Sequence, residues 1–469
     1  MDALAALLQP LGGTLRITGE KVTVLDESSL RDRMDRLVRE AVFGDRSTRD
    51  VARWLIWEIA QDLEIRPASI HELYLARGRG EISRPFTVPA LNLRMLAYDS
   101  ARAAFRASLG LKAAAMIFEI ARSEIAYTDQ RPAEYVSAVL AAAIREGFRG
   151  PVFIQGDHFQ ASAKRYAVDP EAERKAIREL IAESIDAGFY NIDIDTSTLV
   201  DLTRPSLDEQ QWANYSLCAE LTRAIRQHEP EGITISVGGE IGEVGGKNST
   251  PEDLRAFMGG YHRMLGGGVG ISKISIQTGT SHGGVVLPDG TLAQVAIDFE
   301  VLRTLSEIAR REYGMAGAVQ HGASTLPEQA FGKFVEADCC EVHLATAFQT
   351  MIFEHEMLPG ELREQMYAWL RENAAEERKP QDTEAQFLYR TRKKAVGPFK
   401  RQAWELPEER RAALRGSLER VFAFLFEQLA VADTSGLVRQ YVRAPEVHRP
   451  LPTATSEARA ADGVEGLAD

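Results

Sequence analysis

Three histidines directly follow short apolar stretches, each close to a glycine that would let a ligand approach: His158, His282 and His321. Asp157 precedes the first of them, and Glu240 follows another apolar stretch. Three neutral imidazoles with an open fourth position are a common way to hold a catalytic zinc ion. A carboxylate nearby could join the metal or orient one of its ligands. The residue types therefore favour one divalent metal site over three unrelated structural histidines.

The stretch around Asp157 and His158 also predicts the elements that position them. Residues 152–156 are a short apolar run, typical of a strand buried on both faces. A capped helix is predicted from Asp169-Pro170 to Gly188, and a further apolar strand follows at 190–194. Strand, polar tip, helix and strand form a parallel crossover unit. Such units usually carry their chemistry at the carboxyl ends of the strands.

Units of this kind recur, with strands predicted at 87–93, 113–120, 152–156, 190–194, 234–237, 271–276, 317–320 and 340–344. Eight strand–helix units predict a (β/α)8 TIM barrel in the α/β class. A doubly wound open sheet is the main alternative. That fold would more often show a glycine-rich phosphate loop after its first strand, where this chain has Leu91-Asn92-Leu93. The predicted barrel places all three histidines and Glu240 at one rim.

Composition predicts further regions on either side of the barrel. Residues 1–82 are interpreted as a mostly helical N-terminal extension, and 83–356 as the barrel. Residues 357–445 are interpreted as a helical region with helices at 360–375, 383–392 and 408–429, and 446–469 as a disordered tail. A basic cluster lies at 390–401 in this otherwise acidic chain. It is either a solvated surface or a flap that supplies cations to an anionic substrate.

Length, composition, net charge and cysteine count limit the kinds of protein that this chain could be. The chain has 469 residues, 45% of them hydrophobic, which allows two or three domains with a large core. A net charge of −13 argues against nucleic acid or an anionic membrane as a partner. The three cysteines are too few for a disulfide framework, and neither a signal peptide nor a spanning apolar run is visible. We expect a cytoplasmic protein.

Four motifs resemble those of the class II, metal-dependent aldolases, a family that includes the fructose-bisphosphate and tagatose-bisphosphate enzymes: Asp157-His158, Gly239-Glu240-Ile241-Gly242, Gly279-Thr280-Ser281-His282-Gly283 and His321-Gly322-Ala323-Ser324. Their order and strand positions agree over about residues 85–350. The resemblance implies Zn²⁺ on His158, His282 and His321, with Glu240 as an alternative or supporting ligand. A monovalent cation could accompany it. Asp157 would handle the proton of the oxygen at the bond being cleaved.

The implied activity is a zinc-dependent aldolase, a carbon–carbon lyase. It would cleave a ketose phosphate, such as fructose-1,6-bisphosphate or a related sugar, through a metal-stabilised enediolate. The resemblance and the extra helices also lead us to expect a homo-oligomer, either a dimer or a tetramer. Two alternatives stay open: a non-catalytic aldolase-like barrel subunit, and a metal-dependent hydrolase on the same barrel.

The chain departs from the family pattern where the substrate phosphate binds. The run after His282 and Gly283 lacks the expected lysine, and Ala121 occupies the position of a phosphate-binding serine. The eighth strand ends in His343-Leu344-Ala345-Thr346, so only the threonine of its motif survives. Arg122 or the basic cluster at 390–401 could restore a phosphate contact.

The remaining candidate residues complete the predicted site. Glu252 is a candidate base for the proton on carbon. It belongs to the acidic pair Glu252-Asp253, which follows the fifth strand as in the family but after a longer insertion. The residues expected to bind substrate or phosphate lie at the strand tips and in the basic cluster: Asn92, Gly283, Gly322, Ser324, Thr346, Arg390 and Arg392.

Overall fold

A computed structural model describes residues 3–242, 247–279, 297–323 and 326–452. Eight parallel strands form one sheet in the order β6-β5-β4-β11-β10-β9-β8-β7, and β6 also pairs with β7, which closes it into a barrel. The (β/α)8 prediction is confirmed. The strands are β4 (Val88–Asn92), β5 (Ile117–Ala121), β6 (Gly150–Gln160), β7 (Asn191–Asp195), β8 (Ser236–Glu240), β9 (Lys273–Ile276), β10 (Ala318–Gln320) and β11 (Glu341–Leu344).

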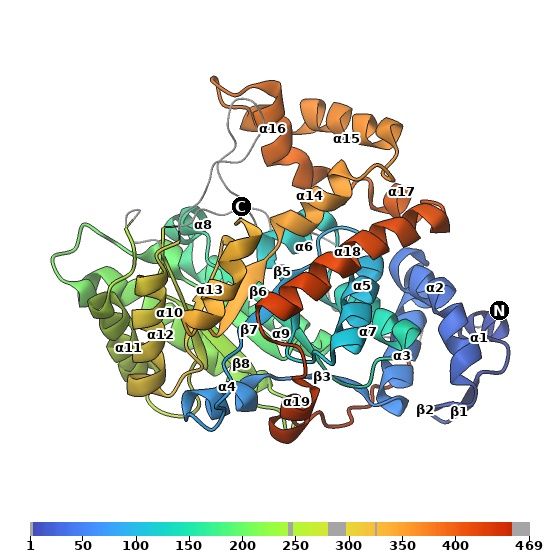
Figure 1. Cartoon of the computed structure of the whole chain (residues 1–469), viewed down its shortest axis with the longest axis horizontal. Helices are drawn as coiled ribbons and strands as arrows, with labels where there is room; N and C mark the ends of the chain where they lie inside the picture. Colours follow the sequence, from blue (N-terminus) through green and yellow to red (C-terminus); the bar gives the residue numbers. More distant parts are fainter. Residues whose placement is uncertain (1–2, 243–246, 280–296, 324–325, 453–469) are drawn as a thin grey trace.

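Helices connect the strands and cover the outside of the barrel (Figure 1). α9 begins where predicted, because the Asp169 carboxylate accepts from the N–H groups of Glu171 and Ala172. It ends at Gly188, whose φ of 110° suits glycine. The connecting helices are α5 (Ala97–Leu111), α6 (Arg122–Thr128), α7 (Pro132–Glu146), α8 (Ala163–Val168), α9 (Pro170–Ala187), η1 (Ser197–Leu199), α10 (Leu207–His228), α11 (Pro251–Leu265), α12 (Phe299–Tyr313), η3 (Glu328–Ala330), α13 (Phe331–Glu336) and α14 (Thr346–Glu354).

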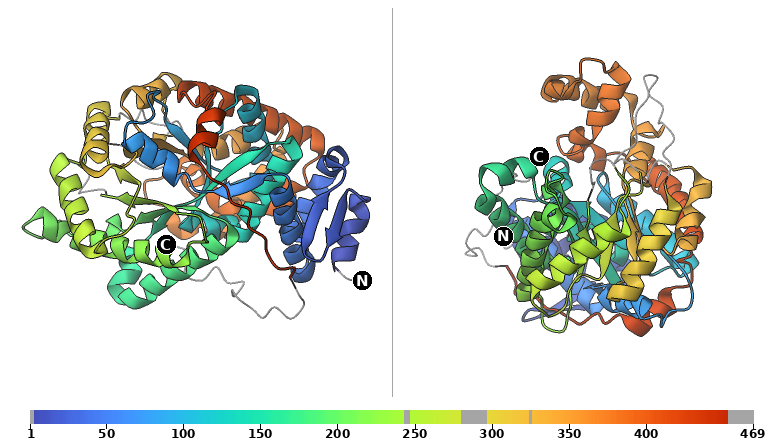
Figure 2. Two further views of the ribbon diagram at one scale, coloured as in Figure 1. Left: turned by 90° about the horizontal axis from the view of Figure 1, so that it is seen from below. Right: turned by 90° about the vertical axis from the view of Figure 1, so that its left-hand side faces the viewer.

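The N-terminal region joins the barrel sheet and closes its lower end. β3 pairs in parallel with the first residues of β6, and the Tyr74 hydroxyl of α4 hydrogen-bonds to Glu341 inside the barrel. The other N-terminal helices gather at one end of the molecule (Figure 2). The elements are α1 (Ala3–Leu11), a hairpin of β1 (Leu15–Thr18) and β2 (Lys21–Val24), α2 (Glu27–Phe43), α3 (Arg46–Asp62), β3 (Ile65–Ala68) and α4 (His71–Gly78).

The C-terminal region contains the three predicted helices and four additional helical elements. Figure 1 shows α15 and α16 standing above the rim of the barrel, while α18 packs along α5, where Arg411 and Arg415 pair with Asp99. The elements are α15 (Gly360–Asn373), η4 (Ala375–Glu377), α16 (Glu384–Thr391), η5 (Arg392–Ala395), α17 (Lys400–Trp404), α18 (Glu408–Gln428) and α19 (Ser435–Tyr441).

Part of the predicted tail lies against the N-terminal region. The indole N–H groups of Trp54 and Trp57 donate to the carbonyls of Arg449 and Val447, at 2.9 and 2.6 Å. The Arg449 guanidinium also stacks on the Trp57 ring. Residues 453–469 lie outside the described residues. None of the described helices is long and apolar enough to cross a membrane.

Candidate active site

The β6 strand continues beyond its predicted end and carries Asp157 and His158 into the barrel mouth on a bulge. Its pairing with β7 shifts register between Gly156 and Phe159. His158 has a φ of 39°, a conformation that non-glycine residues rarely adopt. Such local irregularities re-aim side chains and are common next to active sites. The bulge therefore turns the His158 ring towards the neighbouring strand tips.

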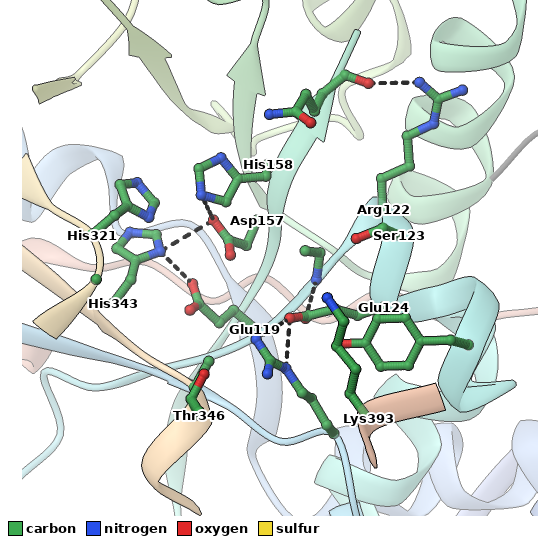
Figure 3. Close-up of a pocket in the computed structure, with 16 residues that line it drawn as sticks. Glu119, Arg122, Ser123, Glu124, Asp157, His158, His321, His343, Thr346 and Lys393 are labelled. Carbon is green, nitrogen blue, oxygen red and sulfur yellow. Dashed lines mark hydrogen bonds and ion pairs between the residues drawn. The ribbon is translucent and has the colours of Figure 1, made fainter. Parts of the chain in front are cut away.

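Three imidazole rings meet at this rim. The ring centroids of His158 and His321 lie 4.2 Å apart, and those of His321 and His343 lie 4.0 Å apart (Figure 3). The structure thus brings together two of the predicted ligands, from β6 and from the residue after β10. The third, His282, lies outside the described residues, as do Gly283 and Ser324.

The donor set here fits a divalent metal ion. Asp157, His158 and His321 each offer a ligand atom, and these atoms lie within 4.8 Å of one another. Two imidazoles and a carboxylate at this spacing suit zinc and other first-row divalent ions. Burial alone would lower the pKa of His158, but Asp157 and Glu240 raise it well above its usual value. The surroundings of the ring thus favour a positive charge, either a proton or a cation.

Contacts with neighbouring polar side chains orient the rings of His158 and His321. The Nδ1 atom of His158 lies 3.1 Å from Asp195 and 3.3 Å from Glu240, while the Nε2 atom faces Asp157 at 3.9 Å. Ser275 lies 3.1 Å from Nε2 of His321. Metal-bound histidines usually have their other ring nitrogen fixed by a carboxylate or hydroxyl in this way. Glu240 thus shares with Asp195 the edge of His158 that faces away from Asp157.

The pKa values of the two supporting carboxylates, Glu240 and Asp195, are shifted in opposite directions. Burial, followed by repulsion from Asp195, raises the pKa of Glu240 to about 7. Burial also acts to raise the pKa of Asp195, but hydrogen bonds from His158, Ser197 and Gln160 outweigh it and lower the pKa. Asp195 is therefore the firmly ionised partner of the His158 imidazole at neutral pH.

A cavity of about 290 Å³ opens above the histidines. Of the predicted substrate contacts, Gly322 and Thr346 line it, whereas Asn92 is buried and donates to Glu124. Arg94 and Arg122 also line it, but Glu124 and Glu173 pair with them at 2.6 Å each. Arg122 is thus already engaged inside the protein.

The basic cluster contributes to this cavity through Lys393 and not through the predicted arginines. Arg390 pairs with Asp382, and Arg392 pairs with Glu354 and stacks 4.1 Å from the centroid of the Tyr389 ring. Neither arginine lines the cavity, because carboxylates of the C-terminal region and α14 hold them elsewhere. Lys393, carried by η5, does line it (Figure 3).

Glu252 lies away from the cavity. It is an exposed residue in the first turn of α11, and its side chain is not among those that line the cavity. Its predicted role as the base for the proton on carbon therefore has no support from its position.

Sequence reasoning missed two buried residues beside the metal donors, Glu119 of β5 and His343 of β11. Both line the cavity, and their side chains are 0% and 4% exposed. The signal that could have found them is the alternation of inward-facing and outward-facing side chains along the predicted strands. It places Glu341 and His343 on the same inward face of β11.

The chain is thus a TIM-barrel protein. Imidazole and carboxylate side chains, which are common metal ligands, gather at the carboxyl ends of its strands, where this fold carries its active sites. The model of the family "Fructose-bisphosphate aldolase class-II" matches residues 83–396, and the chain belongs to this family. The family is generally metal-dependent. No curated protein matches the chain.

Two solved structures support the same fold. The fructuronate-tagaturonate epimerase of Cohnella laeviribosi is 13% identical, with 90% of each chain covered and a TM-score of 0.56. A probable tagatose 6-phosphate kinase of Sinorhizobium meliloti 1021 is 17% identical, with 76% of this chain and 99% of that chain covered and a TM-score of 0.51. At these identities the likeness extends to the fold alone.

The contact between Asp195 and His158 gives a first testable expectation. Asp195→Asn should weaken zinc binding about 10–100-fold, because the amide no longer fixes the His158 ring as a carboxylate does. Competition with a fluorescent zinc chelator measures the affinity. Asp201→Asn is the control, since the Asp201 carboxylate accepts hydrogen bonds from Thr203 and Arg204 in an exposed turn. Equal affinities in wild type and Asp195→Asn would contradict the orienting role.

Proposed function

We propose that this protein is a zinc-dependent enzyme of aldol chemistry, which cleaves or forms a carbon–carbon bond in a ketose that carries an anionic group. The observation that carries the proposal is the convergence of His158 and His321 with Asp157 in one cavity of a class-II aldolase barrel. His282, which lies outside the described residues, is the third proposed ligand by family resemblance.

The zinc ion would be held by the imidazoles. When bound, it would supply Lewis-acid stabilisation of the negative charge that develops on the substrate oxygens during cleavage. Asp195 and Glu240 keep the Nδ1 edge of His158 occupied, which directs Nε2 towards the cavity. The protein thus fixes the ligand rings in place before the ion or the substrate arrives.

Asp157 is the proposed acid–base residue. It lies at the bulge beside His158 and lines the cavity, so a substrate hydroxyl near the imidazoles would be within its hydrogen-bond reach. In the cleavage direction Asp157 would take the proton from the hydroxyl oxygen, and in the reverse direction it would return it. Positioned proton transfer of this kind typically contributes about 10²–10⁴-fold to the rate.

The anionic group of the substrate is assigned to Lys393. Its ammonium group has no ion-pair or hydrogen-bond partner among the described residues, whereas Arg94, Arg122 and Lys394 pair with carboxylates. Lys393 is partly buried, and this burial lowers its pKa. A partly buried ammonium gains more than a fully exposed one from an incoming phosphate or carboxylate.

Epimerisation is the second candidate function. The structure of a fructuronate-tagaturonate epimerase covers 90% of this chain, including regions outside the barrel. Bond cleavage followed by rejoining on the opposite face would invert one carbinol carbon with the same metal site and Asp157. The two candidates differ in the product, since cleavage releases two fragments and epimerisation yields one isomer of the substrate.

The role of Asp157 gives the test of the proposed function. Wild-type protein loaded with zinc should convert an anionic ketose, and Asp157→Asn should lose about 10²–10⁴-fold in kcat while it retains at least one zinc per chain. Mass spectrometry identifies the products, and elemental analysis counts the metal. Asp201→Asn is again the control.

Other outcomes of this experiment would support the rival functions. Wild-type protein without bound metal or turnover would contradict the proposal and favour a non-catalytic barrel subunit. Hydrolysis of an ester or amide, with no carbon–carbon cleavage or epimerisation, would favour a metal-dependent hydrolase.

Two adjacent lysines, Lys393 and Lys394, test whether Lys393 binds the anionic group of the substrate. Lys393→Ala should raise KM for an anionic ketose about 10–100-fold with little change in kcat, because a charge-assisted contact contributes about 1.5–3 kcal/mol. Lys394→Ala is the matched control, since Lys394 pairs with Glu377 and does not line the cavity. For an uncharged ketose both variants should match wild type. An unchanged KM in Lys393→Ala would remove Lys393 from the substrate site.

A further inference from the structure

Three lysine and arginine side chains of the described residues line the cavity, and two of them are already paired. Arg94 and Arg122 each lie 2.6 Å from a carboxylate, that of Glu124 and that of Glu173. Lys393 is the one of these three described side chains without an ion pair (Figure 3). The segments between β8 and α13 that lie outside the described residues contain no lysine or arginine: 243–246, 280–296 and 324–325. The cavity therefore offers an incoming anion one unpaired cation.

Glu124 engages the hydrogen-bond donors that surround Lys393. Its buried carboxylate accepts from Nε of Arg94 at 2.7 Å, and Nη2 of the same guanidinium lies 2.6 Å away. Asn92 donates to it at 2.6 Å. Burial, together with the charge of Glu124 and a hydrogen bond to it, raises the pKa of Tyr127, whose ring lies 5.5 Å from the Lys393 ammonium. The Nε–Nη2 edge of Arg94 and the Tyr127 hydroxyl are thus both taken by Glu124.

Glu124 also takes a backbone donor at the position where the family pattern expects a phosphate-binding serine. That position is Ala121, and its N–H donates to Oε2 of Glu124 at 2.8 Å. The carboxylate therefore occupies a donor that faces the substrate phosphate in the family pattern. The missing serine and the carboxylate both make this end of the cavity a poor phosphate site.

The two common anionic groups of sugars make different demands on a site. A phosphate monoester carries a charge of about −1.5 to −2 at pH 7 and has three acceptor oxygens. Proteins usually bind it with several donors, among which the paired N–H groups of an arginine are preferred. A carboxylate carries a single charge, which one ammonium group balances. One unpaired lysine beside an occupied guanidinium edge suits the carboxylate better.

We infer that Glu124 determines which anion the site accepts, and that it favours a ketose ending in one carboxylate, a keto sugar acid, over a ketose phosphate. Glu124 does so in two ways. It withholds Arg94 and Tyr127 from the ligand, and its own charge beside the cavity repels a dianion more strongly than a monoanion. The inference rests on the proposed function for the reaction of the ketose, but not for the binding of its anionic group.

A purely supporting role of Glu124 is the competing interpretation. In that role its carboxylate would hold the Arg94 guanidinium in place to bind a phosphate. Neutralising Glu124 would then weaken phosphate binding, because Arg94 would lose its orientation. If Glu124 instead withholds Arg94, neutralising it strengthens phosphate binding. The two interpretations therefore predict opposite changes in the affinity for a phosphate.

The binding of two unreactive ligands tests the inference. A hexonate and the hexitol 6-phosphate of matching configuration differ in the anionic group, and neither has the ketone that aldol chemistry requires. Isothermal titration calorimetry with zinc-loaded, full-length wild type should give a Kd about 10-fold or more lower for the hexonate than for the phosphate. In Glu124→Gln, which preserves the size of the side chain, the ratio of the two Kd values should shift about 10–100-fold towards the phosphate.

Two further variants separate charge selection from a general disturbance of the cavity. Glu377→Gln is the matched control, because Glu377 pairs with Lys394 and neither residue lines the cavity. Its Kd ratio should equal that of wild type. The double variant Arg94→Gln/Glu124→Gln should lose the gain in phosphate affinity, since that gain requires the freed guanidinium. Far-UV circular dichroism confirms that each variant is folded.

The outcomes distinguish this inference from the proposed function. A wild type that prefers the hexitol phosphate, or that binds neither ligand, would overturn the inference whatever the variants do. Weaker phosphate binding in Glu124→Gln with unchanged zinc content would assign Glu124 the supporting role instead. Turnover is measured separately with a ketohexuronate and a ketohexose 6-phosphate. Selective binding of the hexonate without turnover of either ketose would contradict the proposed function alone, and turnover together with equal affinities for the two ligands would contradict this inference alone.

Discussion

Charge burial inside a closed barrel is the constraint on which the rest of this structure depends. Closing eight strands removes water from the interior, so each carboxylate that points inward needs a partner of opposite charge. Lys273 reaches Asp193 and Glu341, and the imidazoles face the remaining acids. The electrostatic balance of the core and the chemistry of the rim therefore involve the same side chains. A change at one layer is expected to alter the other.

The regions outside the barrel act on this charged interior from both ends. From below, α4 places Tyr74 against Glu341, so the N-terminal region contributes a hydrogen bond to the acidic layer. From above, η5 places Lys393 at the cavity that contains His158 and His321. The final described residues lie across α3, where both of its tryptophans bind backbone carbonyls. The additional helices thus support the interior and supply the substrate end of the proposed site.

The barrel and part of its site could be predicted from the sequence, because both depend on local patterns. Short apolar strands ending in polar tips gave the eight strands, and the tip positions placed His158 and His321 at one rim. Glu119 and His343 were missed because they lie within strands. Only the inward-facing alternation, and not a tip position, marks them. Their contacts with Asp157 also depend on how the sheet closes, because β5 is next to β6, whereas β11 is three strands away and His343 reaches Asp157 across the barrel interior.

The basic cluster shows a different limit of prediction. Six lysines and arginines between 390 and 401 look equivalent in the sequence: Arg390, Arg392, Lys393, Lys394, Lys400 and Arg401. Which of them pair inside the protein depends on carboxylates far away in the chain or across a turn. Glu354, for example, pairs with Arg392, and Glu134 pairs with Lys400. Only the fold reveals that Lys393 is directed at the cavity.

Anomalous diffraction at the zinc absorption edge, from crystals of the zinc-loaded protein, would locate the bound metal. We predict an anomalous peak at the rim of the barrel, about 2.0–2.1 Å from a nitrogen of His158 and from a nitrogen of His321. A fully loaded protein with no peak near these two rings, or with zinc only at distant surface sites, would contradict the proposal that this rim is a metal-dependent active site.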